Sequence, residues 1–234
     1  MALVLDFTAT SSNLPAFLAN WEADFSYRGN GSFNEIRNGA DQWFAGTGDG
    51  SSVIVTGDDY SGTAGVVDGT VSSLVLGADL SYSPSSDTWS QDAGLSIDLA
   101  GATLSETWDA AISDLSQNGS LDGLYAYFAE QGTVQNGTVG NDTYFSFEGA
   151  DTFVFDEKIG RDTVIGFDPC EGDVIDLSGV SWIGSYVDLL LHSNILSNPL
   201  GDLVLSNGSE SITFTDYAAA RIIIDGFGDS FAYA

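Results

Sequence analysis

Four short repeats between residues 140 and 177 constrain the fold of this chain more than any other feature. Three of them, at 140–145, 149–155 and 160–165, read G-x-D-T followed by apolar residues, and a looser copy lies at 172–177. A glycine permits a tight turn, and the short apolar run after it suits a strand with a buried face. The repeats therefore predict short strands joined by tight turns.

The first three repeats place an aspartate two residues after the glycine, and in the fourth Asp173 follows Gly172 directly. A nine-residue period of this G-x-D type is the signature of a β-roll that binds calcium, because calcium prefers oxygen ligands. We therefore predict that calcium ligands come from five aspartates of this region: Asp142, Asp151, Asp162, Asp168 and Asp173. The alternative is that the repeats form ordinary β-turns with solvated aspartates.

The segments 149–155 (GADTFVF), 162–168 (DTVIGFD) and 172–178 (GDVIDLS) resemble the C-terminal RTX region of proteins exported by bacterial type I secretion. This resemblance implies an uncleaved C-terminal signal, export in one step and folding driven by external calcium. The short apolar end of such proteins is matched loosely by 231–234. The repeats are few and degenerate, which limits the expected calcium sites to one or two, or to none.

The charge balance excludes several classes of partner. Five Lys and Arg residues stand against 34 Asp and Glu residues, for a net charge of −29. Such a chain repels nucleic acid and anionic membrane surfaces, because both bind proteins through Lys and Arg. We find no apolar run long enough to span a membrane, and no basic N-terminal signal peptide.

The single cysteine, Cys170, excludes an internal disulfide. The chain is therefore either cytosolic or exported without the usual oxidising route. The RTX resemblance favours export to the outside or surface of a Gram-negative bacterium.

The N-terminal part mixes helical and strand patterns and predicts an α+β fold with helices on one face of a sheet. The Gly- and Asn-rich segment 27–50 reads as a long loop. The predicted elements are a helix at 14–25 capped by Asn13, strands at 52–56, 62–68, 70–76 and 89–99, a helix at 104–115 with Thr103 and Glu106 in capping-box spacing, and a helix at 121–131 capped by Ser120.

The sequence texture divides the chain into three regions. Residues 1–135 form the α+β domain, 136–182 hold the degenerate repeats, and 183–234 form a β-rich C-terminal secretion region. We expect the whole chain to be monomeric.

A second resemblance rests on 14–21 (LPAFLANW), 77–82 (GADLSY) and 118–124 (NGSLDGL). In this order and spacing they are similar to the secreted hemophore (HasA) family of haem-acquisition proteins, over roughly residues 3–135. The resemblance implies a curved antiparallel sheet with helices on one face. It also implies that haem sits between two loops, held by a tyrosine from one and usually a histidine from the other.

Tyr82 falls on the tyrosine ligand of that family, and Asp87 lies roughly where a helper histidine is usual. A carboxylate can accept the phenol proton, but its negative charge disfavours a phenolate. The loop 27–50 has no histidine, although its Arg28 and Arg37 could pair with haem propionates. The alternatives are that Tyr82 is an ordinary strand-end aromatic and that both arginines are solvated.

Other residues narrow the range of functions. Trp43, Phe44 and Trp89 could line a pocket, although aromatic residues more often belong to a core. There is no H-E-x-x-H motif, and the one histidine, His192, offers no catalytic triad. We therefore expect no enzymatic activity.

Two hypotheses follow. The first is a secreted haem-binding protein for iron acquisition, with the type I secretion machinery and an outer-membrane haem receptor as partners. The second is a non-catalytic, calcium-binding RTX protein of the cell surface, an adhesive or a matrix, whose hemophore-like domain is a scaffold that binds no haem.

Overall fold

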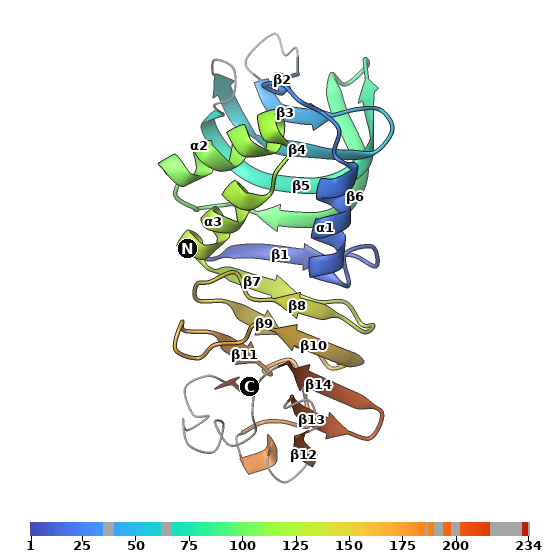
Figure 1. The fold of residues 1–234 in the computed structure, drawn as a ribbon, viewed down its shortest axis with the longest axis vertical. Helices are drawn as coiled ribbons and strands as arrows, with labels where there is room; N and C mark the ends of the chain where they lie inside the picture. The colour runs from blue at the N-terminus through green and yellow to red at the C-terminus, as the bar shows by residue number, and fades with distance from the viewer. Residues whose placement is uncertain are drawn as a thin grey trace.

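The computed structural model describes residues 1–34, 40–61, 67–185, 187–189, 194–197, 202–215 and 231–233. It is an elongated α+β molecule (Figure 1). Within the described residues the strands form one sheet of ten and one of five. None of the described helices is long and apolar enough to cross a membrane.

The N-terminal half is built on an antiparallel sheet in the order β1-β6-β5-β4-β3-β2. Three helices lie in front of this sheet, whose strands curve (Figure 1). The elements are β1 (Leu3–Phe7), α1 (Leu14–Asp24), β2 (Ser32–Phe33), β3 (Ala40–Gly46), β4 (Ser51–Ser61), β5 (Asp68–Ser83), β6 (Thr88–Asp98), α2 (Glu106–Ser113), the π-helical turn η1 (Asp114–Asn118) and α3 (Asp122–Gln131). The predicted fold class is therefore confirmed for this half.

Helix α1 begins where the sequence predicts. The Asn13 side chain accepts a hydrogen bond from the Ala16 amide at 3.1 Å, and Pro15 lies in the first turn. Leu14, Leu18 and Trp21 form its buried face. This face packs into one hydrophobic core with the inward residues of the sheet and of α2 and α3.

Helix α2 differs from its prediction. It begins at Glu106 after Ser105, which makes no side-chain cap hydrogen bond, so the capping box of Thr103 and Glu106 is wrong. It continues into η1, which ends at Gly119 in the left-handed conformation. Helix α3 begins at Asp122 with Leu121 in the cap position, so the prediction of Ser120 as the cap is wrong by one residue. The Ser120 hydroxyl still accepts from the Asp122 amide at 3.1 Å.

The prediction of a loop across 27–50 is also wrong. Its residues 40–46 form strand β3, which pairs with β4 along most of its length. The alternation of half-buried and buried residues in β3 is short, and glycines on both sides obscure it in the sequence. The strand predicted at 70–76 lies within the longer strand β5, which begins at Asp68. Residues 62–66 of the strand predicted at 62–68 lie outside the described residues.

Strand β7 (Thr133–Asn136) carries the sheet into the repeat region. It pairs in parallel with β1 on one side and with β9 on the other, so the large sheet is continuous (Figure 1). Further parallel strands follow: β9 (Thr152–Val154), β11 (Val174–Asp176) and β15 (Phe231–Ala232) extend this sheet, while β8 (Thr143–Phe145), β10 (Arg161–Ile165) and β14 (Glu210–Phe214) lie in the second one. The chain thus alternates between two sheets as it passes through the repeats.

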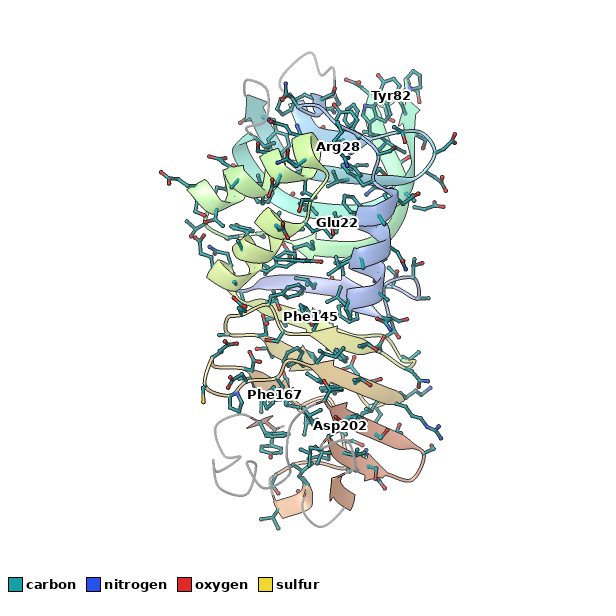
Figure 2. The ribbon with its side chains drawn as sticks, viewed as in Figure 1. Glu22, Arg28, Tyr82, Phe145, Phe167 and Asp202 are labelled. Carbon is teal, nitrogen blue, oxygen red and sulfur yellow. The ribbon has the colours of Figure 1, made fainter. Side chains whose placement is uncertain are left out.

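Strand β8 lies at one edge of the second sheet, and residues that precede it in the chain form hydrogen bonds with its backbone. The Thr143 backbone amide donates to the Ser12 carbonyl oxygen at 2.6 Å. The side-chain amide of the buried Gln135 donates to the Phe145 carbonyl oxygen at 2.6 Å. These contacts satisfy backbone groups that an edge strand would otherwise expose. Phe145 lies at this junction (Figure 2).

The aspartates of the four repeats form a hydrogen-bonded series through this region, which we call the aspartate ladder (Asp142, Asp151, Asp162 and Asp173). All four side chains are buried. Within each sheet, one carboxylate oxygen of the later aspartate accepts a hydrogen bond from the backbone amide of the earlier aspartate. Asp162 accepts from the Asp142 amide at 2.8 Å, and Asp173 accepts from the Asp151 amide at 3.0 Å.

In three of the four aspartates, the other carboxylate oxygen accepts a hydrogen bond from a backbone amide of the loop that precedes that aspartate. Asp142 accepts from the Thr138 amide at 2.8 Å, and Asp151 accepts from the Phe147 amide at 2.7 Å. Asp173 accepts from the Asp168 amide at 2.9 Å. The repeated aspartate therefore fixes both the turn before it and the turn beside it.

The C-terminal part adds β12 (Asn194–Ser197) and β13 (Leu203–Asn207), which extend the second sheet from β14 in antiparallel pairs. A second hydrophobic core runs from Tyr144 to Phe231 inside the two sheets. His192 lies outside the described residues.

The ladder predicts that stability falls as pH rises. Burial raises the pKa of Asp162 to about 8, helped by the carboxylates of Asp142 and Glu210, and raises that of Asp173 to about 6. Because both folded-state pKa values exceed those of an unfolded carboxyl, the folded chain binds extra protons between about pH 4 and pH 8. We expect the melting temperature to be higher at pH 5.5 than at pH 8.5, by roughly several degrees.

The variant Asp162→Asn keeps the oxygen that accepts from Asp142 and removes the ionisation. Thermal melts followed by circular dichroism should show a smaller pH dependence for this variant. An equal pH dependence in both proteins would contradict the assignment to Asp162.

Candidate functional site

Tyr82 lies at the tip of the hairpin formed by β5 and β6. It is directly opposite Trp89, and Ser83 and Thr88 close the turn. The side chain of Tyr82 is 43% exposed, which is unusual for a large ring in this chain. It lies at the upper end of the molecule, away from the repeats (Figure 2).

The Tyr82 hydroxyl donates a hydrogen bond to Asp87 Oδ1 at 2.7 Å. Asp87 has a left-handed backbone with φ of 53°, which ends the turn and directs the carboxylate back across it. The two residues predicted as a pair are therefore brought together. The Asp87 carboxylate therefore already accepts the phenol proton of Tyr82 in a hydrogen bond.

Aromatic rings continue from Tyr82 across the sheet. The centroids of Tyr82 and Trp89 are 5.0 Å apart, and Trp89 stacks on Phe44 at 4.1 Å. Trp89 and Phe44 are half-buried, whereas Trp43 points into the core and is fully buried. Of the three aromatics considered for a pocket, Trp89 lies beside Tyr82, Phe44 stacks on Trp89 and Trp43 belongs to the core.

Side-chain amides hold this hairpin tip against β3. Gln42 accepts from the Trp89 amide at 2.8 Å and donates to the Trp89 carbonyl oxygen at 3.0 Å. In a flat sheet β3 and β6 would lie about 14 Å apart, three strand spacings. Curvature and a folded-over hairpin tip bring the two strands within reach of one glutamine.

The buried Asn34 makes a second link. Its amide nitrogen donates to the Asp87 carbonyl oxygen at 3.1 Å and to Asp41 Oδ1 at 2.6 Å. Its oxygen accepts from the amides of Asp41 and Gln42. The segment before β3 is thereby tied to the residue that accepts the Tyr82 proton. Sequence reasoning missed Asn34 and Gln42, because neither occurs in a motif.

The two arginines have different outcomes. Arg28 lies just after α1, and its Nη1 donates to the carbonyl oxygens of Phe25 at 2.8 Å and Tyr27 at 2.6 Å (Figure 2). Its guanidinium also packs closely over Gly119, where a Cβ would clash with it. These contacts give Arg28 a role in joining α1 to η1. Arg37 lies outside the described residues.

The predicted calcium ligands are placed as follows. Asp142, Asp151, Asp162 and Asp173 are the buried aspartate ladder, and Asp168 is half-buried and accepts from the Cys170 amide at 2.8 Å. Across the described ranges, no group of three or more His, Cys, Asp or Glu side chains is arranged to hold a metal ion. The oxygens of the ladder mainly serve backbone amides.

This arrangement can stabilise a hard cation next to Tyr82. A phenolate is a hard, anionic oxygen ligand of the kind that holds ferric haem. Asp87 can take the phenol proton, and Trp89 and Phe44 offer apolar surface for a flat, largely apolar ligand. The donor set therefore fits haem through one protein oxygen.

Comparisons with known proteins give structural matches only. The apo structure of the hemophore HasA from Yersinia pestis is 17% identical, with a TM-score of 0.45, over 56% of this chain and 88% of that chain. Its holo structure gives 17% identity and the same score, over 56% and 90%. A HasA mutant monomer from Yersinia pseudotuberculosis gives 16% identity at 0.45, over 56% and 90%. No protein-family model and no curated protein matches the chain.

The clamp on the hairpin tip predicts a local effect of Gln42→Leu. This change removes both hydrogen bonds to Trp89, and we expect a loss of about 1–3 kcal/mol in the free energy of unfolding. Hydrogen exchange of the amides in 83–89 should become faster in this variant.

Gln91→Leu is the matched control. Gln91 also lies on β6, but it donates to the Val75 carbonyl oxygen and accepts from Ser52 instead. Unchanged exchange at the hairpin tip in Gln42→Leu would show that Gln42 does not hold it.

Proposed function

We propose that this chain is a secreted, non-catalytic haem-binding protein of the hemophore type, with Tyr82 as the iron ligand. The observation that carries the proposal is the exposed Tyr82 hydroxyl bonded to Asp87 Oδ1 at 2.7 Å. The hemophore resemblance, through its segment 77–82, implies the same residue as the ligand. Haem, when bound, supplies a ferric iron whose positive charge favours a phenolate ligand.

The residues of the chain prepare the phenol for this role. Ionisation moves the proton from Tyr82 Oη to Asp87 Oδ1, which already accepts it. A second negative charge beside the phenolate would be unfavourable, so transfer of the proton to Asp87 leaves only one charge at the pair. The links from Gln42 and Asn34 keep both residues at the hairpin tip in this geometry.

The proposal extends to location and partners. It places the protein outside a Gram-negative bacterium, exported by the type I machinery and delivering haem to an outer-membrane receptor. The RTX resemblance of the repeat region supports this route of export. We propose that it acts as a monomer.

A hemin titration followed at the Soret band tests the proposal. We expect a saturable Soret shift in the wild type and its loss in Tyr82→Phe, which removes the iron-binding oxygen. In Asp87→Asn the affinity should fall and recover partly at high pH, because the acceptor of the phenol proton is gone. Tyr125→Phe on α3 is the matched control and should bind as the wild type does.

The proposal fails if the wild type gives no Soret shift. It also loses its assigned ligand if Tyr82→Phe keeps the shift while its circular dichroism spectrum shows a folded protein.

A second candidate function is a calcium-stabilised scaffold that binds no haem. One observation favours it: the segment 27–50 contains no histidine, so the partner ligand implied by the hemophore resemblance is lacking. We expect that millimolar calcium would then raise the melting temperature relative to chelator, through preferential binding to the folded chain. Equal melting temperatures would remove this candidate and leave the haem proposal standing.

A further inference from the structure

A cavity of about 310 Å³ lies between the first turns of the repeat region. The residues that line it belong to the repeat region and are far in sequence from the hairpin tip that carries Tyr82. Its size is at the lower end of the roughly 300–1,000 Å³ usual for small-molecule sites. Its walls come from Asn136, Gly137, Thr138, Tyr144, Val154, Phe155, Asp156, Lys158, Ile159 and Asp162.

Asp162 is the exception within the aspartate ladder. The other three members each bind an amide of the preceding loop with their second oxygen. Asp162 Oδ1 accepts from the Asp142 amide, but no donor in the described part of the chain reaches its other oxygen. The side chain is only 2% exposed and lines the cavity. The second oxygen is open to this cavity and can accept a hydrogen bond from a molecule that fills it.

The loop before Asp162 is hydrogen-bonded to a later part of the chain and not to the Asp162 carboxyl. The carboxylate of Glu157 accepts from the Ser181 amide at 2.9 Å and from its hydroxyl at 2.7 Å. This contact ties the loop to the next turn of the chain. The loop amides are therefore not placed on Asp162, and the cavity remains beside it.

Lys158 lines the same cavity and is the single lysine of the chain. One wall thus carries a buried carboxyl and another carries an exposed ammonium group. A simple amine would be repelled by Lys158, and a simple carboxylate would be repelled by the ionised form of Asp162. Because burial raises the pKa of Asp162 to about 8, its ionised form at neutral pH depends on an ammonium group bound beside it. A molecule with both charges complements both residues.

We propose that this cavity binds a small zwitterion of the amino-acid class. Its ammonium group donates to the open oxygen of Asp162, and its carboxylate pairs with Lys158. Tyr144, Phe155 and Ile159 supply apolar wall for a side chain. Calcium suits the cavity less well, because it takes about six to eight oxygen ligands and would lie close to the Lys158 charge.

Isothermal titration of the full chain with glycine, leucine and phenylalanine tests this site. At least one of them should bind saturably, and methylamine, acetate and calcium chloride should each bind at least about tenfold more weakly. Asp162→Asn and Lys158→Gln should each lower the affinity by about tenfold or more, as expected for the loss of one charged hydrogen bond. Asp162→Asn retains the oxygen that accepts from Asp142.

Two substitutions of the same kind outside the cavity are controls. Asp176→Asn lies on β11, and Arg161→Gln is exposed on β10 and donates to the Ser209 carbonyl oxygen. Both should bind as the wild type does. If Asp162→Asn does not fold, Lys158→Gln still tests the site. The Lys158 side chain is exposed, so its replacement should leave the fold intact.

The inference is overturned if none of the three amino acids binds by about 10 mM, or if affinity is unchanged in Lys158→Gln. It is equally overturned if methylamine, acetate or calcium binds as tightly as the best amino acid. Hemin binding is measured separately, and none of these outcomes depends on it.

Discussion

The parallel pairing of β1 with β7 is the contact on which the rest of the molecule depends. Strand β1 closes the antiparallel sheet through β6 on one edge and opens the parallel series through β7 on the other. The N-terminal half therefore acts as a cap for the repeats. It supplies a sheet edge to β7 and backbone partners at Ser12 to β8. Short parallel strands have little stability alone, so this junction gives the repeats a template.

Burial decides what the repeated aspartates do. A carboxylate on the surface is free to bind a cation, whereas a buried one must be satisfied within the protein. In this chain, Asp151 and Asp173 use both oxygens on backbone amides of neighbouring turns. Asp142 uses one oxygen on the Thr138 amide and the other on the Thr138 hydroxyl. Asp162 keeps one oxygen open to the cavity, and Glu157 in the loop before it accepts from the Ser181 amide. The same residue type at the same position in the repeat thus has two different environments.

The hairpin tip shows a related division between local and distant causes. The turn from Ser83 to Thr88 is local and brings Asp87 back onto Tyr82. Its position relative to β3 depends on the curvature of the whole sheet, which places Gln42 on Trp89. A phenol at the end of a free hairpin would sample many orientations, and the side-chain amides reduce that freedom. This restriction is what a binding site with few ligands requires.

The sequence by itself determined the local features of this protein. The cap at Asn13, the strand-and-turn character of the repeats and the closeness of Tyr82 to Asp87 follow from neighbours within a few residues. It did not reveal β3, whose pairing with β4 outweighs the loop-like composition of 27–50. Nor did it reveal the burial of the ladder aspartates, the role of Gln42 or the cavity between Asp162 and Lys158. These features were decided by the tertiary structure alone, because they depend on sheet curvature and on contacts between turns far apart in the chain.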